Sequence, residues 1–214
     1  MSAVKQVAEE FVILDFETTG LSPEYARIIE VGAVLIKQGK VVDTLSQLMH
    51  PGHNIPYFIT EITGITNQMI KGMPSPEKFM PTLIKFIGNR PILAHNASFD
   101  QKFLEAEVAN AGRVINSTFL CTLKLARRLI HNVPSYKLST LTACLKLEVS
   151  ADHRAHRALN DVMATFQLWL HMKNIVLSHI DTDPDFDLFL RLEKQPKSNI
   201  LKFLNKYKVT KYIT

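Results

Sequence analysis

The sequence has few cysteines and no long apolar run, and these absences exclude several classes of protein. Cys121 and Cys144 are the two cysteines of the 214 residues, and neither has companions at zinc-binding spacing. We therefore expect no zinc site and no disulfide, but two small buried apolar side chains. No apolar stretch approaches the roughly 18 residues that a membrane span needs. Residues 1–10 lack the apolar segment of a secretory signal, so we expect a cytoplasmic protein.

Acidic residues are scarce at the C-terminal end. Residues 191–214 contain seven Lys or Arg and one acid, a net charge of +6, which leaves −1 for the rest of the chain. Just before them, residues 181–187 hold four acids around a proline. This pattern is typical of a linker. We therefore predict one catalytic domain over 1–175, an acidic linker over 176–190 and a basic amphipathic tail over 191–214.

The tail combines apolar residues at helical spacing with lysines. The apolar residues are Ile200, Phe203, Leu204 and Tyr207, and the lysines are Lys202, Lys206, Lys208 and Lys211. The lysines would suit contacts with phosphates, whereas the apolar side chains would suit docking on a polymerase, on another protein or on the body of the chain itself. The sequence leaves these roles open.

Apolar runs and turn residues predict an α/β fold with a mixed sheet. We expect strands over 11–15, 28–37, 41–48 and 91–95, and helices from about 76 to 88, 98 to 111, 123 to 130, 139 to 145 and 159 to 172. The second and third strands are expected to form a hairpin, and the later elements to alternate as β-α units. The chain between 53 and 74 is expected to be irregular.

Two carboxylates end the first strand. Asp15 and Glu17 are two residues apart, so both side chains lie on one side of the sheet. Such close like charges are stable as anions mainly when a hard divalent cation lies between them, and oxygen ligands favour Mg²⁺ or Mn²⁺. A strand that ends in acids is, however, more often a solvated edge.

Two further acids begin predicted helices. Asp100 lies in the first turn of one helix, where an acid commonly compensates the helix dipole, and Asp161 lies near the start of the last long helix. His156 precedes Asp161 by five residues, which is about 140° of rotation on a regular helix. The two side chains can converge on one site only if His156 lies before the regular helix.

Three segments together resemble the motifs of the DEDD exonuclease superfamily. They are Asp15-Phe-Glu-Thr-Thr-Gly-Leu, His95-Asn-Ala-Ser-Phe-Asp and His156-Arg-Ala-Leu-Asn-Asp, and the last is similar to the branch that carries histidine in its third motif. The similarity runs from about residue 11 to 172 and is greatest to the proofreading exonucleases of bacterial replicative polymerases. Ribonuclease T and oligoribonuclease belong to the same branch.

The resemblance implies a ribonuclease H-like fold, two Mg²⁺ or Mn²⁺ ions and release of nucleoside 5′-monophosphates from single-stranded 3′ ends. It implies that Asp15, Glu17, Asp100 and Asp161 are the metal ligands, and that His156 is the general base. Thr18, Gly20 and Phe99 are implied to contact the terminal nucleotide, although a core role for Phe99 is equally plausible. These positions are taken from the resemblance and not from spacing.

One position departs from the pattern of these relatives. Proofreading enzymes often have a histidine before Gly-Ile, where this chain has Thr63. That departure puts a substrate contact in doubt but no metal ligand. DNA is the expected substrate, with RNA trimming as the alternative. An inactive nucleic-acid-binding module is disfavoured, because all four carboxylates and the histidine are present.

Overall fold

The computed structural model describes residues 10–148 and 157–208, and the sheet at its centre has five strands. The strands are β1 (Glu10–Thr18), β2 (Ile28–Lys37), β3 (Lys40–Leu48), β4 (Ile92–Ala94) and β5 (Phe119–Cys121), in the order β3-β2-β1-β4-β5. β1, β2 and β3 pair antiparallel, whereas β4 and β5 run parallel to β1. The expected mixed sheet is therefore present.

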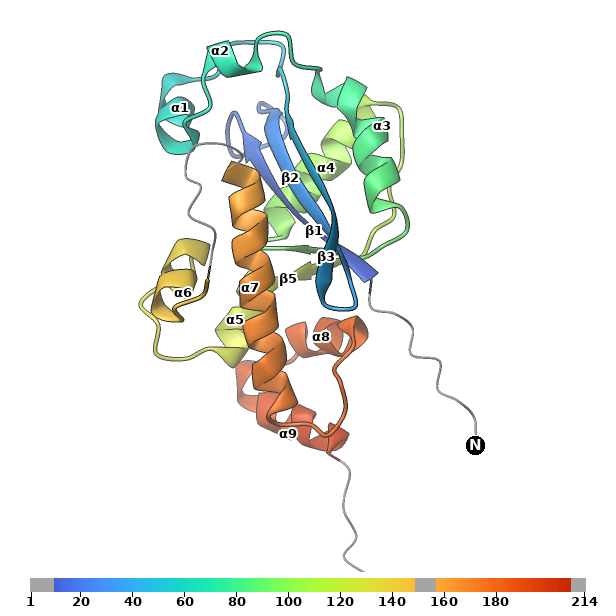
Figure 1. Cartoon of the computed structure of the whole chain (residues 1–214), viewed down its shortest axis with the longest axis vertical. Helices are drawn as coiled ribbons and strands as arrows, with labels where there is room; N and C mark the ends of the chain where they lie inside the picture. The colour runs from blue at the N-terminus through green and yellow to red at the C-terminus, as the bar shows by residue number, and fades with distance from the viewer. Residues whose placement is uncertain (1–9, 149–156, 209–214) are drawn as a thin grey trace, which may run out of the picture.

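Nine α-helices and two 3-10 turns surround this sheet in the described part of the chain (Figure 1). They are α1 (Tyr57–Thr63), α2 (Asn67–Ile70), α3 (Pro76–Ile87), α4 (Ser98–Asn110), α5 (Thr122–Leu129), α6 (Leu138–Cys144), α7 (Arg157–Leu177), α8 (Phe186–Glu193), α9 (Ile200–Leu204), η1 (Lys197–Asn199) and η2 (Asn205–Tyr207). Within these residues no helix is both long and apolar enough to cross a membrane.

Alternation along β1 divides the core into two layers. Phe11 and Ile13 face α5, α7 and α8, whereas Val12 and Leu14 face α3 and α4. All four side chains are at most 1% exposed, as expected for a strand covered on both faces. The sheet is thus the middle layer between two sets of helices, and α7 lies along the face that carries Phe11 and Ile13 (Figure 1).

The C-terminal helices extend the first of these layers. Leu188, Phe189 and Leu192 of α8 belong to the core cluster that contains Trp169 of α7, and the Phe189 and Trp169 rings lie 4.3 Å apart between centroids. Ile200 and Leu204 are buried in the same cluster. Part of the segment expected as a linker is therefore helical, and the apolar face of the tail packs on the body of the chain.

Two local expectations were wrong. The segment expected to be irregular contains α1 and α2, which are short helices that bury Ile59 and Ile70 against Ile29 of the sheet. Both are too short for a periodic signal, because one or two turns offer few repeats. Cys121 is buried as expected, but Cys144 is exposed at the end of α6. Both described cysteines are free thiols, in agreement with the prediction.

Candidate metal and active site

The register of β1 and β2 determines which residues face α7. Asp15 lies opposite Gly32 and Glu17 opposite Glu30, and both pairs have the same orientation as Ile13 opposite Val34. Ile13 and Val34 belong to the core under α7. Because side chains alternate along a strand, the two acids of β1 face α7 as well. The prediction that they share one side of the sheet is confirmed.

Gly32 lets α7 approach the sheet closely. A Cβ atom at this position would lie 2.4 Å from the backbone carbon of Ala158 and 2.4 Å from the nitrogen of Leu159. Real Cβ atoms do not come so near to backbone, so only glycine fits here. The first turn of α7 rests directly on β2 for this reason, and it carries Asp161 toward the acids of β1.

Three carboxylates converge at this point. One ligand oxygen from each of Asp15, Glu17 and Asp161 lies within 4.8 Å of the other two. Asp161 is the most exposed of the three, and the two acids of β1 are partly buried. We call these three residues the acidic cluster. Oxygen atoms at these separations could all coordinate one divalent cation, and carboxylate oxygens are the ligands that Mg²⁺ and Ca²⁺ prefer.

Asp100 lies close to the acidic cluster but comes from the other side of the sheet. It belongs to the first turn of α4, is 1% exposed and raises the pKa of Asp15 through its charge. None of the described residues donates a hydrogen bond to Oδ1 of Asp100. A buried carboxylate oxygen without a donor is costly, and a cation or its bound water would satisfy it.

The acidic cluster is strained electrostatically without a cation. Burial raises the pKa of Glu17 to about 7, and the charges of Asp161 and Glu30 add to that increase. Burial, followed by the charges of Asp100 and Asp161, raises the pKa of Asp15 well above its usual range. The pKa of Asp161 is also raised by desolvation, against the charge of Arg157. Ionised carboxylates this close repel one another, and a divalent cation among them would relieve that repulsion.

Glu30 is a fifth acid at the site, and the sequence patterns did not predict it. It is 2% exposed on β2, raises the pKa of Glu17 and accepts a hydrogen bond at Oε2 from the backbone nitrogen of Ala158 at 3.3 Å. Ala158 is in the first turn of α7, where backbone N–H groups have no partner within the helix. Glu30 therefore holds α7 in place. A lone acid inside the apolar run Ile28-Ile-Glu-Val was the signal that could have identified it.

Arg157 connects the start of α7 to α1. Its Nη1 atom donates a hydrogen bond to the backbone oxygen of Ile62 at 2.8 Å. Its guanidinium also covers Gly64, where a Cβ atom would lie 2.4 Å from Nη2 and where φ is +65°. α1 is thereby fixed beside the acidic cluster, with the side chains of Tyr57 and Ile62 78% and 71% exposed.

The turn after β1 is held by its own polar contacts. The hydroxyl of Thr18 donates to the backbone oxygen of Gly20 at 2.6 Å, and Thr18 is 7% exposed. Further along, Arg27 donates from Nε and Nη2 to the two carboxylate oxygens of the buried Glu107, at 2.7 and 2.9 Å, and also pairs with Glu77. The loop from Gly20 to Arg27 is therefore tied to both α3 and α4.

Two other sequence-selected positions are also described. Phe99 is partly buried, and its ring lies 4.9 Å from the Phe103 ring between centroids. Thr63 is 4% exposed, and its hydroxyl donates to the backbone oxygen of Ile59 at 2.8 Å. Thr63 therefore stabilises the end of α1 and does not present its hydroxyl at the surface. His156 lies outside the described residues, so its predicted place before the last long helix stays a prediction.

Comparison with known proteins agrees with this geometry. Residues 12–169 match the family model described as "Exonuclease". The chain belongs to this exonuclease family. The matched segment spans β1 to α7 and so contains all four acids of the DEDD resemblance.

Two of the curated relatives of this chain are named as DNA polymerase III proteins. The chain is 38% identical over 160 residues to the DNA polymerase III PolC-type of Clostridium perfringens, and the aligned segment covers 75% of the chain and 11% of that protein. It is 32% identical over 161 residues to DNA polymerase III subunit epsilon of Aquifex aeolicus, covering 75% of the chain and 78% of that subunit. The chain thus spans about a tenth of the PolC-type relatives and most of the epsilon subunit.

Solved structures have the same fold. Exonuclease X, in a complex with 5′ overhanging duplex DNA, superposes with a TM-score of 0.64 at 31% identity, over 77% of this chain and 91% of that one. Escherichia coli exonuclease I, in a complex with a dT13 oligonucleotide, gives a TM-score of 0.67 at 19% identity, over 81% of this chain and 44% of that one. The predicted ribonuclease H-like architecture is confirmed.

Proposed function

We propose that this exonuclease removes nucleotides from the 3′ end of single-stranded DNA in a reaction that depends on Mg²⁺ or Mn²⁺. The convergence of Asp15, Glu17 and Asp161 within 4.8 Å carries the proposal, together with the family membership of the chain. DNA is favoured over RNA because the relatives are named as DNA polymerase III proteins and the similar structures contain DNA. The products would be nucleoside 5′-monophosphates.

The acids have distinct proposed roles. Asp15, Glu17 and Asp161 would hold the ion beside the attacking water, and Asp15 would also reach a second ion that Asp100 supports through water. Bound divalent ions supply charge stabilisation for the attacking and leaving oxygens of the displacement. The unpartnered oxygen of Asp100 and the raised pKa values of the cluster support this set of ligands.

We assign the chain to the histidine branch and take His156 as the general base. An imidazole suits that task because its proton affinity lies near neutral pH. The turn with Thr18 and Gly20, and the partly buried ring of Phe99, would contact the terminal nucleotide. α1 would flank this nucleotide, because Ile62 is exposed and Arg157 donates a hydrogen bond to its backbone oxygen.

We further propose a cytoplasmic protein that works alone or beside a replicative polymerase. The named relatives support that setting. Because Ile200 and Leu204 are buried, contact with a polymerase through the tail would involve the exposed Leu201, Lys202 and Lys206.

The test compares single-stranded DNA labelled at its 5′ or its 3′ end, and an RNA of the same sequence, in one Mg²⁺ buffer. We expect a ladder of shortened products from the 5′-labelled DNA, immediate release of labelled mononucleotide from the 3′-labelled DNA, and slower cleavage of RNA. Asp15→Asn should abolish all of these products while it remains folded. Faster cleavage of RNA, or release of mononucleotide from the 5′ end, would overturn the proposal.

A further inference from the structure

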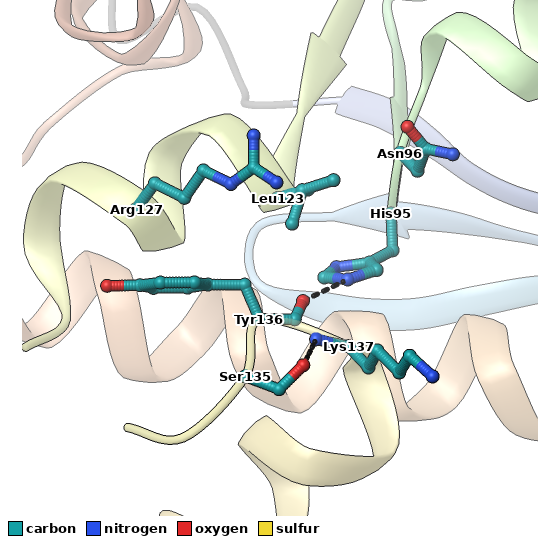
Figure 2. A pocket seen from close by; sticks show the side chains of 7 residues that line it. All are labelled: His95, Asn96, Leu123, Arg127, Ser135, Tyr136 and Lys137. Carbon is teal, nitrogen blue, oxygen red and sulfur yellow. Dashed lines mark hydrogen bonds between the residues drawn. The ribbon is translucent and has the colours of Figure 1, made fainter. Parts of the chain in front are cut away.

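A basic pocket lies at the same edge of the sheet as the acidic cluster but on different strands. It has a volume of about 480 Å³ and is lined by His95, Asn96, Leu123, Arg127, Ser135, Tyr136 and Lys137 (Figure 2). We call it the basic pocket. Its lining contains two cations, Arg127 and Lys137, and no carboxylate.

The register of the parallel strands shows how near the pocket is to the acidic cluster. Ile13 of β1 lies beside Leu93 of β4, so His95 follows β4 at the level of Asp15. Ala94 lies beside Cys121 of β5, and α5 starts at the next residue. Adjacent strands are about 4.8 Å apart, so the pocket is of the order of 5–10 Å from the end of β1 along the edge. The carboxyl edge of parallel strands is also where α/β folds commonly bind ligands.

His95 forms a fixed inner wall of the basic pocket. Its Nε2 atom donates to the backbone oxygen of Tyr136 at 3.0 Å, and its Nδ1 atom lies 2.9 Å from the hydroxyl of Thr122. Burial lowers the pKa of His95, and the charge of Arg127 lowers it further against the hydrogen bond to Tyr136. His95 is therefore neutral near pH 7 and ties β4 to the segment before α6. The positive charge of the pocket comes from Arg127 and Lys137.

The neighbouring cations on α5 already have partners. Lys124 pairs with Glu193 at 2.9 Å, and Arg128 donates from Nε to the backbone oxygen of Gln195 at 2.8 Å. These two contacts attach the C-terminal helices. Arg127, by contrast, has no carboxylate partner among residues 10–148 and 157–208, and its guanidinium lies across the pocket from the backbone of Tyr136 (Figure 2).

We propose that the basic pocket binds the phosphodiester backbone of the substrate strand on the 5′ side of the terminal nucleotide, with Arg127 and Lys137 as the phosphate contacts. Neither cation has a carboxylate partner within residues 10–148 and 157–208, and both lie near the site proposed to take the 3′ end, so their charge matches that of such a strand. The apolar surface of Leu123 and Tyr136 suits the sugars and bases between the phosphates. This inference rests on the proposed function, since it assumes that a strand enters the acidic cluster.

The matched experiment uses two double variants that each remove two positive charges. One is Arg127→Gln with Lys137→Gln in the pocket. The control is Lys40→Gln with Lys85→Gln, two exposed positions near the opposite end of the sheet, where the start of β1 pairs with the end of β2. The hydrolysis of single-stranded DNA of 2, about 6 and about 12 nucleotides is measured for both variants and for the wild type.

We expect the KM of the pocket variant to rise with substrate length, by about threefold or less for the dinucleotide and by tenfold or more for the longest strand. The slope of log K against log salt for DNA binding should fall by about 1.4 in magnitude, because each single-strand phosphate contact contributes about 0.7. The control variant should keep the wild-type KM at every length and the wild-type slope. Circular dichroism and thermal unfolding verify that both variants are folded.

Three results would overturn the inference. They are an unchanged slope and KM in the pocket variant, an equal loss in the control variant, and an equal loss for the dinucleotide and the longest strand. If thymidine 5′-monophosphate inhibits the pocket variant more weakly than the wild type while the KM for DNA is unchanged, the inference is likewise overturned. The pocket would then be a binding site for the product. If the wild type cleaves no 3′ end, the proposed function fails, and the salt slope of binding still decides whether the pocket contacts DNA.

Discussion

Replacement of Gly32 by alanine tests how the acidic cluster is assembled. The added Cβ atom would lie 2.4 Å from backbone atoms of Ala158 and Leu159, whereas ordinary contact starts at 3.4 Å, so α7 and β2 must separate by about 1 Å. Asp161 follows on the next turn of α7 and would move with it. A displacement of about 1 Å in an active site can reduce the rate on the order of 100-fold. Overpacking of this kind also costs about 1–3 kcal/mol of stability.

The assay measures kcat for cleavage of a 3′-labelled DNA strand, the affinity for Mn²⁺ by titration calorimetry, and the midpoint of thermal unfolding. We expect Gly32→Ala to remain folded, to lose about 100-fold in kcat and to bind Mn²⁺ more weakly. Ile36→Val is the matched control, because Ile36 is on the same strand and the same face but away from the acids. It should lose about 0.5–1.5 kcal/mol of stability and keep its rate. A folded Gly32→Ala protein with wild-type kcat and metal affinity would refute the reasoning.

Three further predictions concern charge, the α1 contact and the general base. In chelator, the stability of the protein should fall as pH rises from about 4.5 to about 7, because Glu17 has its pKa raised to about 7 and the folded state holds the proton that the unfolded state releases. Glu17 contributes roughly 3 kcal/mol to this change in the free energy of unfolding, and Glu17→Gln should remove that contribution. A thermal unfolding midpoint of the wild type that stays flat across this pH range would argue against the raised pKa. Arg157→Gln should remove the hydrogen bond to Ile62 and so cost about 1 kcal/mol of local stability, which corresponds to about fivefold faster hydrogen exchange at the Gly64 amide. Unchanged exchange would mean that α1 does not depend on Arg157. His156→Ala should reduce kcat by about 100-fold or more without a change in Mn²⁺ affinity, and a rate near that of wild type would exclude it as the base.

The sequence predicted the parts of the site that follow from local periodicity. Alternation along a strand was enough to place Asp15 and Glu17 on one face, and apolar spacing was enough to indicate α4 and α7, which carry Asp100 and Asp161. Each of these signals is contained in one element. The DEDD resemblance then supplied the order in which the elements combine.

Other parts depend on contacts between distant segments, and local patterns do not encode them. Gly32 matters because α7 crosses β2 at that residue, more than 120 positions away in the chain. Glu30 and Arg157 likewise act on backbone atoms of other elements. The acids at 181–187 suggested a linker, although Asp185 caps α8 by accepting from the backbone nitrogen of Leu188 at 2.7 Å. Linkers and helix caps use the same residue types, so composition alone could not separate them.

We propose above all that Asp15, Glu17 and Asp161 hold the metal ion on which cleavage depends. The most direct test is anomalous diffraction from crystals of the protein soaked in Mn²⁺, with Asp15→Asn crystals as the comparison. We expect an anomalous peak within coordination distance of oxygens from all three carboxylates in the wild type, and a lost or much weaker peak in the variant. Well-ordered wild-type crystals that bind Mn²⁺ elsewhere, or not at all, would contradict it.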